Sequence, residues 1–271
     1  MNKENPDEYR LQLIFDSLLA HYGRQNWWPA DNPFEMMIGA ILTQSTNWKN
    51  VEKALSNLKQ AGAMDCFTLA ELRQADIAAL IRPAGYFNVK AAKLKVFCIW
   101  LKENYGCNLN NLFALDTTSL RRELLAVFGI GPETADSIIL YAAGKPSFVV
   151  DAYTMRIFQR LKTGPKKANY GEFREFFMYN LPLDAYLFNE FHALVVKLGK
   201  DVCRKTPICT RCCLGSLCPT ADLMSEVLDN GKKIREKVIL TYYRDKKSPV
   251  TKGKFFQGNV SGMSFPVALH D

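Results

Sequence analysis

Four cysteines near the end of the chain have the spacing expected of ligands to one metal centre. They form the pattern Cys-x5-Cys-x2-Cys-x5-Cys and are Cys203, Cys209, Cys212 and Cys218. Four thiolates at this spacing can hold a [4Fe–4S] cluster or a tetrahedral zinc ion. Zinc sites more often use two separated pairs of ligands, so one compact loop favours the cluster. Cys213 is a spare thiol that competes with Cys212 if the register differs.

The other three cysteines, Cys66, Cys98 and Cys107, are scattered along the chain. The polar N-terminal segment resembles neither a secretory signal nor a transit peptide, so the expected location is the cytoplasm. Disulfides are not expected there, and isolated cysteines usually behave as small buried apolar residues. We therefore expect no role for these three. No run approaches the roughly 18 apolar residues of a membrane helix, so no membrane association is expected.

A second pattern is the pair Gly129 and Gly131, which flank one apolar residue between two helical segments. Glycine permits positive φ and close approach of the backbone to a neighbour. Pro132 suits the first position of a helix, where its missing N–H costs nothing. The free amides of the hairpin and of the helix start, including that of Thr134, are then available to bind a DNA phosphate. An ordinary tight turn between packed helices has the same Gly-x-Gly spacing.

A third candidate is Asp151, which follows an apolar run and precedes a helix. An aspartate in this position is usually an N-cap that accepts hydrogen bonds from backbone amides. The functional interpretation is an ionised carboxylate near a reacting centre, one helix and one turn after the glycine pair. The two interpretations are compatible, because a cap is also a rigid mount. The three histidines, His21, His192 and His270, provide no obvious general acid.

The elements that must position these residues are helices. Apolar residues recur at helical spacing near the N-terminus at 11–19, 34–42 and 51–58. The spacing further predicts helices over 70–81, 89–104, 117–127, 133–143, 152–161, 170–180 and 184–199. The run 147–150 is too short and isolated to build a sheet. The predicted fold class is therefore all-α.

Composition supports a folded chain and a polyanionic partner. Of the 271 residues 48% are hydrophobic and 12% aromatic, which excludes a largely disordered or fibrous protein. The net charge is +8, and residues 231–271 hold nine basic and three acidic side chains, or six of the eight net charges. This segment has no amphipathic period, and we interpret it as a poorly ordered basic tail. The charge alone indicates nucleic acid only weakly.

The three motifs, in this order, resemble the helix–hairpin–helix DNA glycosylases of the endonuclease III type over residues 8–222. The resemblance implies two helical domains flanking a DNA cleft. Residues 29–145 would form a six-helix barrel with the hairpin at 129–131, and residues 1–28 with 146–230 an iron–sulfur domain. It also implies that Asp151 is catalytic, that the four cysteines hold a [4Fe–4S] cluster, and that the partner is double-stranded DNA with a damaged base, bound by a monomer.

The chain departs from the family pattern at two positions. The first cysteine spacing is one residue shorter than usual in the family. Bifunctional members have a lysine where this chain has Glu133, and its amine forms a Schiff base with the deoxyribose. A carboxylate cannot form that adduct. We therefore expect cleavage of the base–sugar bond without a lyase step, and Glu133 as a pocket residue or a first-turn acid that favours the helix dipole.

A narrower resemblance is to the 3-methyladenine glycosylase branch of the superfamily. It rests on Trp27, Trp28 and the segment from Ile41 to Trp48. By this resemblance Gln44 enters the duplex in place of the flipped base, and the three tryptophans line the base pocket. Indole faces attract a cationic base by about 0.5–2 kcal/mol. The alternative for any one of these tryptophans is packing in the core.

The reaction expected is hydrolysis of the N-glycosidic bond of an alkylated purine. The base must leave the helical stack, and ionised Asp151 would stabilise the oxocarbenium-like sugar and orient or deprotonate water. One alternative is a glycosylase for oxidised pyrimidines or mismatched thymine, with an AP lyase step supplied by another amine. A second alternative, from another class, is a non-catalytic iron–sulfur protein that binds DNA.

Overall fold

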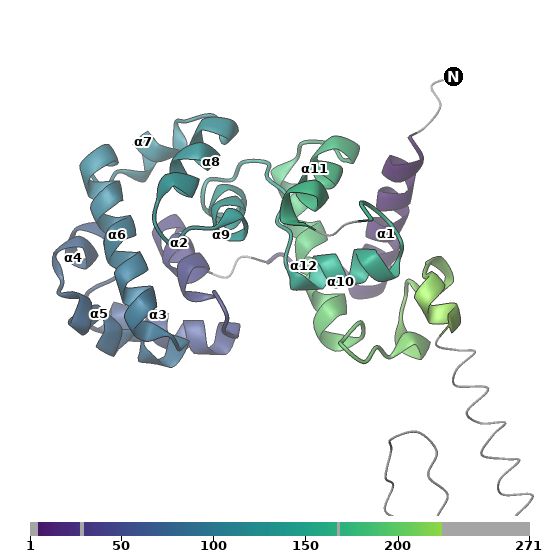
Figure 1. The fold of residues 1–271 in the computed structure, drawn as a ribbon, viewed down its shortest axis with the longest axis horizontal. Helices are drawn as coiled ribbons and strands as arrows, with labels where there is room; N and C mark the ends of the chain where they lie inside the picture. The colour runs from purple at the N-terminus through teal and green to yellow at the C-terminus, as the bar shows by residue number, and fades with distance from the viewer. Residues whose placement is uncertain (1–4, 28–29, 167–168, 224–271) are drawn as a thin grey trace, which may run out of the picture. The chain divides into compact units, whose positions relative to one another are not determined.

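A computed structural model describes residues 5–27, 30–166 and 169–223 of the chain (Figure 1). All regular secondary structure in these ranges is helical, which confirms the all-α prediction. No helix in these ranges has the length and apolar character needed to cross a lipid bilayer. Trp28 and the predicted basic tail lie outside the described residues, and the predicted domain boundaries remain a prediction.

Twelve α-helices form the described part of the chain. Their bounds are α1 (Pro6–Tyr22), α2 (Pro33–Leu42), α3 (Trp48–Gln60), α4 (Cys66–Glu71), α5 (Gln74–Leu80), α6 (Phe87–Tyr105), α7 (Leu109–Phe113), α8 (Thr117–Ala126), α9 (Pro132–Ser137), α10 (Ala152–Arg160), α11 (Tyr170–Asn180) and α12 (Ala185–Asp201). Four shorter elements are a π-helix, η2 (Ile138–Ala142), and the 3₁₀ turns η1 (Arg82–Ala84), η3 (Cys209–Arg211) and η4 (Gly215–Leu217).

Two of the predicted helices differ from those observed. The segment 70–81 is not one helix, because the backbone leaves the helical conformation at Leu72 and Arg73 is the N-cap of the separate helix α5. The segment 133–143 is helical, but its second half is wound as the π-helix η2. Apolar spacing does not predict the break between α4 and α5, because both of these short helices keep their apolar residues on the buried side. Nor does it distinguish a π-helix from an α-helix in η2, where every residue is buried.

Asparagine and aspartate side chains define most helix starts. Nine of the described helices begin after an Asn or Asp whose side-chain oxygen accepts a hydrogen bond from a backbone amide of the first turn. This is the N-cap interaction, worth about 1 kcal/mol per helix. Helix α9 is different: it follows Gly131, with no side-chain cap, and has Pro132 in its first turn.

The helices pack in two groups (Figure 1). Helix α6 packs along α4 and α5, and α2 packs against α3, α6 and η2. Helix α1 packs against α11 and α12, so the first described helix lies beside the last two α-helices. In the second group, which contains α1, α11 and α12, aromatic rings pack against one another, and those of Phe148 and Phe177 stack with centroids 3.8 Å apart. Contacts of α9 with α2, α8 and α11 connect the groups.

A buried ionic network fixes α9. The carboxylate of Asp136 has no exposed surface, and it accepts hydrogen bonds from Arg121 Nε at 2.9 Å and Arg174 Nε at 3.0 Å. It also accepts hydrogen bonds from Tyr170 Oη at 2.8 Å and from the hydroxyl of Ser147. Helices α8, α9 and α11 and the segment leading to Asp151 are thereby tied to one carboxylate.

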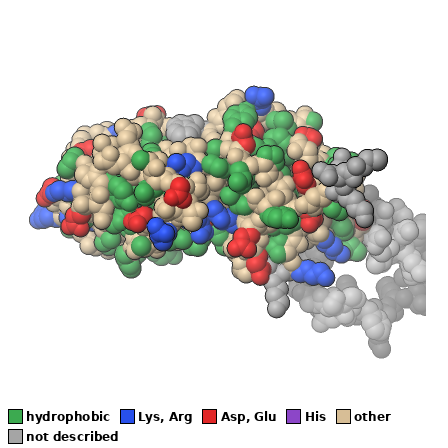
Figure 2. Space-filling model, turned by 90° about the horizontal axis from the view of Figure 1, so that it is seen from above, with side chains coloured by type: hydrophobic (Ala, Val, Ile, Leu, Met, Phe, Trp, Pro, Cys, Tyr) green, Lys and Arg blue, Asp and Glu red, His purple; other side chains and the backbone are tan. Residues whose placement is uncertain are grey.

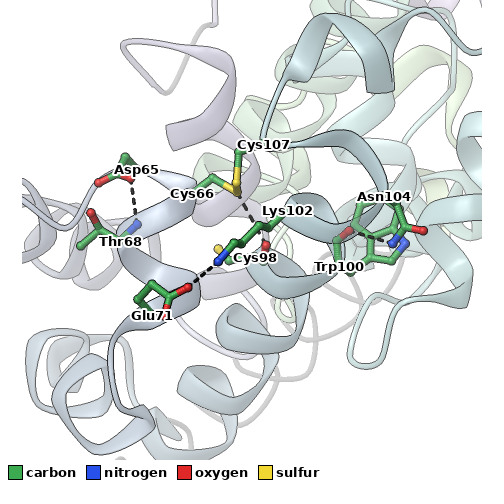
Figure 3. The surroundings of a disulfide bond; sticks show 9 residues. All are labelled: Asp65, Cys66, Thr68, Glu71, Cys98, Trp100, Lys102, Asn104 and Cys107. Carbon is green, nitrogen blue, oxygen red and sulfur yellow. Dashed lines mark hydrogen bonds and ion pairs between the residues drawn. A yellow bond between two sulfur atoms is a disulfide. The ribbon is translucent and has the colours of Figure 1, made fainter.

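The expectation that the chain has no disulfide is wrong for two cysteines. Cys66, the first residue of α4, is bonded to Cys107, which follows the end of α6 (Figure 3). The two residues are 41 positions apart, and only the packing of α4 along α6 brings them together. Cys98 is free and buried, as expected, and burial raises the pKa of its thiol to about 12.

We predict that Cys107→Ser lowers the free energy of unfolding by about 4 kcal/mol, because the crosslink no longer restricts the unfolded chain. Urea unfolding of both proteins under non-reducing conditions measures the difference. The same comparison under dithiothreitol is the control, and there the two proteins should unfold at nearly the same urea concentration. Equal stability without reductant would show that the disulfide does not form in solution.

Candidate active site

One cavity of about 590 Å³ collects the residues of the predicted glycine hairpin. Five of the predicted site residues line it: Gln44, Gly129, Gly131, Glu133 and Thr134. The remaining lining residues are Lys93, Ile130, Pro132 and Tyr170. Side chains from the end of α2, from α6 and from the start of α9 therefore converge on a single concave surface.

Gln44 links the turn after α2 to the hairpin. Its side-chain Nε2 donates to the backbone oxygen of Gly129 at 3.0 Å and to Thr134 Oγ1 at 3.1 Å. Lys93 Nζ donates to the Gln44 oxygen. The insertion of Gln44 into DNA remains a prediction, but the position of Gln44 beside the hairpin agrees with that role. Sequence reasoning missed Lys93, since one lysine on a long helix has no distinguishing spacing.

The two hairpin glycines differ in backbone conformation and in surroundings. Gly129 has φ +86°, and a Cβ on it would lie 2.4 Å from Cγ of Lys93. Gly131 has φ −91°, and a Cβ there would meet no atom within 4 Å. Gly129 is therefore required by backbone conformation and by packing. Gly131 instead leaves the start of α9 open toward the cavity, where the first-turn amides have no side-chain cap.

Glu133 is exposed in this cavity. Desolvation by the cavity wall and, second, the negative charge of Asp151 raise the pKa of Glu133 above its ordinary value. The effect of Asp151 on Glu133 shows that the two carboxylates interact electrostatically. Glu133 stands in the first turn of α9.

Asp151 is the N-cap of α10, as its sequence position predicts. Its Oδ1 accepts hydrogen bonds from the backbone amide of Thr154 at 2.7 Å and from its hydroxyl at 2.9 Å. Its Oδ2 lies 3.7 Å from Nε2 of His192, and the side chain is 14% exposed. Burial opposes ionisation, but His192 and Thr154 outweigh it and lower the pKa of Asp151 below the ordinary value. The carboxylate is therefore ionised at neutral pH.

The residue that sequence analysis missed here is His192. It lies on the buried face of α12 between Phe191 and Ala193, a position typical of a core residue. Its Nδ1 hydrogen-bonds to the hydroxyl of Tyr141 in η2, and its ring stacks on Trp27 with centroids 5.6 Å apart. A single histidine in an apolar stretch carries no sequence signal for this environment.

The predicted pocket tryptophans lie in different places. Trp27 contacts His192 and Tyr141 beside Asp151, with centroids 5.6 and 5.7 Å from those rings. Trp48 begins α3, and its indole lies over Gly39 of α2, 3.2 Å from the position of a Cβ there. Neither of these two lines the 590 Å³ cavity. Their contact with a flipped base remains a prediction.

The four predicted cysteine ligands line one small cavity with Arg160 of α10. They come from the end of α12 and from the turns η3 and η4: Cys203, Cys209, Cys212 and Cys218. Cys213 is not among its lining residues. Arg160 Nη1 lies 3.2 Å from Cys203 Sγ. Burial, followed by weaker effects that include the other thiols, raises the pKa of Cys212 to about 11.

The cysteine loop has the donor atoms of a metal site. Within the described residues, no three or more His, Cys, Asp or Glu side chains are arranged as a finished metal site. The donor set nevertheless fits a cluster: four thiols from separate turns face one cavity next to an arginine. Four ionised thiols this close together would repel each other in a hydrophobic core. The loop is therefore better suited to bind an iron–sulfur centre than to serve as core packing.

On the face seen in Figure 2, Lys and Arg side chains are interspersed with Asp and Glu. No single basic stripe marks a nucleic-acid interface on that face. Charge is therefore a weaker guide to the site than the hairpin and the two carboxylates.

Comparison with known proteins gives a consistent result. The family model described as "HhH-GPD superfamily base excision DNA repair protein" matches residues 38–182. A protein of Methanocaldococcus jannaschii assigned by name as a DNA repair glycosylase is 46% identical over 80% of this chain and 98% of its own. Endonuclease III of Thermotoga maritima is 28% identical over 69% of this chain and 83% of its own.

Solved structures agree with these relatives. The 3-methyladenine DNA glycosylase of H. pylori, bound to 1,N6-ethenoadenine, superposes with a TM-score of 0.61 at 28% identity over 72% of this chain and 97% of that chain. A non-covalent endonuclease III–DNA complex superposes with a TM-score of 0.70 at 20% identity over 81% and 98%. The latter likeness supports the fold.

We predict that Gly129→Ala lowers the free energy of unfolding by about 2 kcal/mol, because alanine is strained at positive φ and its Cβ meets Lys93. Gly131→Ala is the matched control and should cost less than about 1 kcal/mol. In the double variant with Lys93→Ala the clash disappears and only the backbone strain remains, so about half the loss should return. Urea unfolding measures all four proteins, and equal costs at the two glycines would contradict the geometry.

Proposed function

Because the chain belongs to the HhH-GPD superfamily of base excision DNA repair proteins and is a DNA glycosylase, we propose that it hydrolyses the N-glycosidic bond of an alkylated purine, as a monomer and without a lyase step. The observation that carries the proposal is the pair of carboxylates, with Asp151 kept ionised and Glu133 in the lysine position. The non-catalytic alternative is not retained, since the chain is an enzyme.

The proposed reaction depends on the free oxygen of Asp151. The target base leaves the stack at a cost of a few kcal/mol, which is least for a damaged base. As the base departs, positive charge develops on the sugar, and the ionised carboxylate stabilises it. Oδ1 is engaged by Thr154, so Oδ2 is the oxygen available to the sugar or to an attacking water. The cap holds the carboxylate in place without consuming both oxygens.

An alkylated purine suits the charges of this site. Such a base is already cationic, so it departs with little acid catalysis. The carboxylates of Glu133 and Asp151 give the site negative charge. An aromatic ring is also close by, because Trp27 stacks on His192, which borders Asp151. Both features favour a cation over a neutral base. The 28% identity to the H. pylori 3-methyladenine DNA glycosylase supports the same substrate class.

A second candidate function has one observation in its favour. Lys93 lines the cavity and is an amine close to the hairpin. A glycosylase for oxidised pyrimidines or mismatched thymine could use such an amine for an AP lyase step. The relatives include a thymine-DNA glycosylase of Aeropyrum pernix, 23% identical over 78% of this chain and 96% of its own. Against this, the Lys93 ammonium is bound to Gln44, and neither residue contacts Asp151 in the interactions described here.

We also propose that Cys203, Cys209, Cys212 and Cys218 hold a [4Fe–4S] cluster. Through its bonds to the four cysteine sulfurs, the cluster would connect η3, η4 and the end of α12. In this chain Arg160 would offset the negative charge of the thiolates. Its guanidinium already holds the loop, because Nη1 also donates to the backbone oxygen of Arg204 and Nη2 donates to that of Lys205. No step of the base-release reaction passes through this site.

The proposed function predicts base release without a covalent adduct. Single-lesion duplexes carrying 3-methyladenine, 1,N6-ethenoadenine, thymine glycol or a G·T mismatch are incubated with the protein, and the released base is identified by mass spectrometry. We expect release of the alkylated or etheno purine, a loss of at least about 100-fold in Asp151→Asn, and no borohydride-trapped complex.

The control is Glu133→Lys, which restores an amine at the position of the family's lysine. If the site geometry is that of the family, this variant should become trappable while wild type does not. Borohydride trapping of wild type, abolished by Lys93→Ala, would instead establish the second candidate. Release of thymine or thymine glycol alone would refute the alkylated-purine proposal.

The cluster proposal predicts unequal effects of two adjacent cysteines. Cys212→Ala should remove most of the bound iron and the absorption near 400 nm, since a four-thiolate site loses one ligand. Cys213→Ala, the matched control, should retain both. Iron and sulfide analysis of the purified proteins measures this. Zinc in place of iron, or identical behaviour of the two variants, would contradict the assignment.

A further inference from the structure

His192 occupies a closed aromatic and polar site behind Asp151. The imidazole is 5% exposed. It is covered on one face by Trp27, with an interplanar angle of 23°, and it borders Tyr141 of η2. Its two nitrogens face different partners: Nδ1 meets the Tyr141 hydroxyl, and Nε2 lies 3.7 Å from Asp151 Oδ2. A line thus runs from Tyr141 through His192 to Asp151, and α12 brings His192 to it from a distant part of the sequence.

The two oxygens of Asp151 are in different situations along this line. Oδ1 accepts both hydrogen bonds from Thr154, which are cap interactions. Oδ2 faces the imidazole, whose Nε2 is buried and has no hydrogen-bond partner within 3.5 Å in the described residues. A buried unpaired ring nitrogen costs free energy unless it finds a partner. A small rotation of the carboxylate would bring Oδ2 into hydrogen-bond range and satisfy both groups.

The hydrogen bond between Tyr141 and Nδ1 of His192 fits either direction, and the pairing of His192 with Asp151 requires Tyr141 to be the donor. Complete burial, together with the charge of Asp151, raises the pKa of Tyr141 well above its ordinary value, so the phenol keeps its proton. A phenol that donates to Nδ1 leaves the neutral ring with its proton on Nε2. That N–H then points at Oδ2. The arrangement selects one tautomer, as a carboxylate–histidine pair does in other enzymes.

From this geometry we propose that His192 is a positioning residue for the reaction: held by Tyr141, it orients Oδ2 of Asp151 and favours the ionised carboxylate. The inference rests on the proposed role of Asp151. His192 is not expected to touch the DNA, because it is covered by Trp27 and buried. Its effect reaches the sugar only through Asp151.

Two other charged groups face this line. Glu133 of α9 interacts electrostatically with both Asp151 and His192. Glu190, on the same helix as His192, is buried and accepts hydrogen bonds from the backbone amides of Gln25 and Asn26. Glu190 therefore fixes the loop that places Trp27 over the imidazole. Helix α12 thus contains both His192 and Glu190, which holds the loop of the Trp27 ring that covers His192.

The sign of the expected pH effect follows from these contacts. Burial raises the pKa of Asp151, and His192 lowers it. Without His192, only the hydrogen bonds from Thr154 oppose the effect of burial, so the carboxylate takes up a proton at higher pH. Base release requires ionised Asp151, so its acid limb should move to higher pH when His192 is removed.

The test compares His192→Leu, His192→Gln and Tyr141→Phe with wild type. The readout is single-turnover release of base from a duplex methylated with dimethyl sulfate, between pH 4 and 9. We expect His192→Leu to lose about 30-fold in rate and to shift its acid limb upward by about one pH unit, with duplex affinity unchanged within about threefold. His192→Gln, which keeps an N–H donor, should recover part of the rate.

Tyr141→Phe should lose less rate than His192→Leu, because the imidazole remains but its tautomer is no longer fixed. A folding defect would appear in circular dichroism and in duplex affinity and would leave the acid limb where it is. If His192→Leu folds and retains the wild-type rate and acid limb, the proposal is wrong. If both His192 variants fail to fold, Tyr141→Phe and the spectroscopic test below decide.

Nitrogen-15 NMR of the imidazole tests the same pairing without any activity. The wild-type His192 ring should show a protonated Nε2 and an unprotonated Nδ1, and Asp151→Asn should shift the Nε2 signal. A ring protonated on Nδ1, or one indifferent to Asp151→Asn, would overturn the inference. If wild type releases no methylated base but the NMR pattern is present, the proposed substrate fails while the pairing stands.

Discussion

The arrangement of the candidate site depends on one buried carboxylate, which binds four neighbouring side chains. Asp136 is fully buried between Arg121 and Arg174, and its oxygens also accept hydrogen bonds from Tyr170 and Ser147. Removing one partner of such a network leaves an uncompensated charge, which costs more than the network itself contributes. Because Asp136 is in α9 and Ser147 precedes Asp151 by four residues, the network sets the hairpin and the segment that bears Asp151 relative to each other.

Local sequence determines much of this structure. The N-cap position of Asp151, the glycine hairpin, the helical periods and the four cysteines depend on residues close together in the chain, and each was predictable from spacing. What spacing does not reveal is pairing across the fold. His192 joins Asp151 across 41 residues, Lys93 joins Gln44 across 49, and Cys66 joins Cys107 across 41. Each pair exists only after helices pack, so a single sequence gives no signal for it.

The boundary at Leu72 has a different cause. Residues 70–81 have helical apolar spacing, yet the chain breaks into α4 and α5 because both must pack on α6. Lys95 of α6 donates to the backbone oxygens of Ala70 and Leu72, which satisfies carbonyl groups at the end of α4. The break is thus stabilised by a residue more than twenty positions away. Tertiary contacts override the local period here.

The two carboxylates of the site show how one environment gives two protonation behaviours. Desolvation acts on both and favours the neutral acid. Asp151 overcomes it through the Thr154 cap and through His192, whereas Glu133 has no such donors among its described contacts and is also repelled by Asp151. Desolvation therefore leaves Asp151 ionised but makes Glu133 easier to protonate. In the proposed reaction, Asp151 is thus the carboxylate whose negative charge is available beside the sugar.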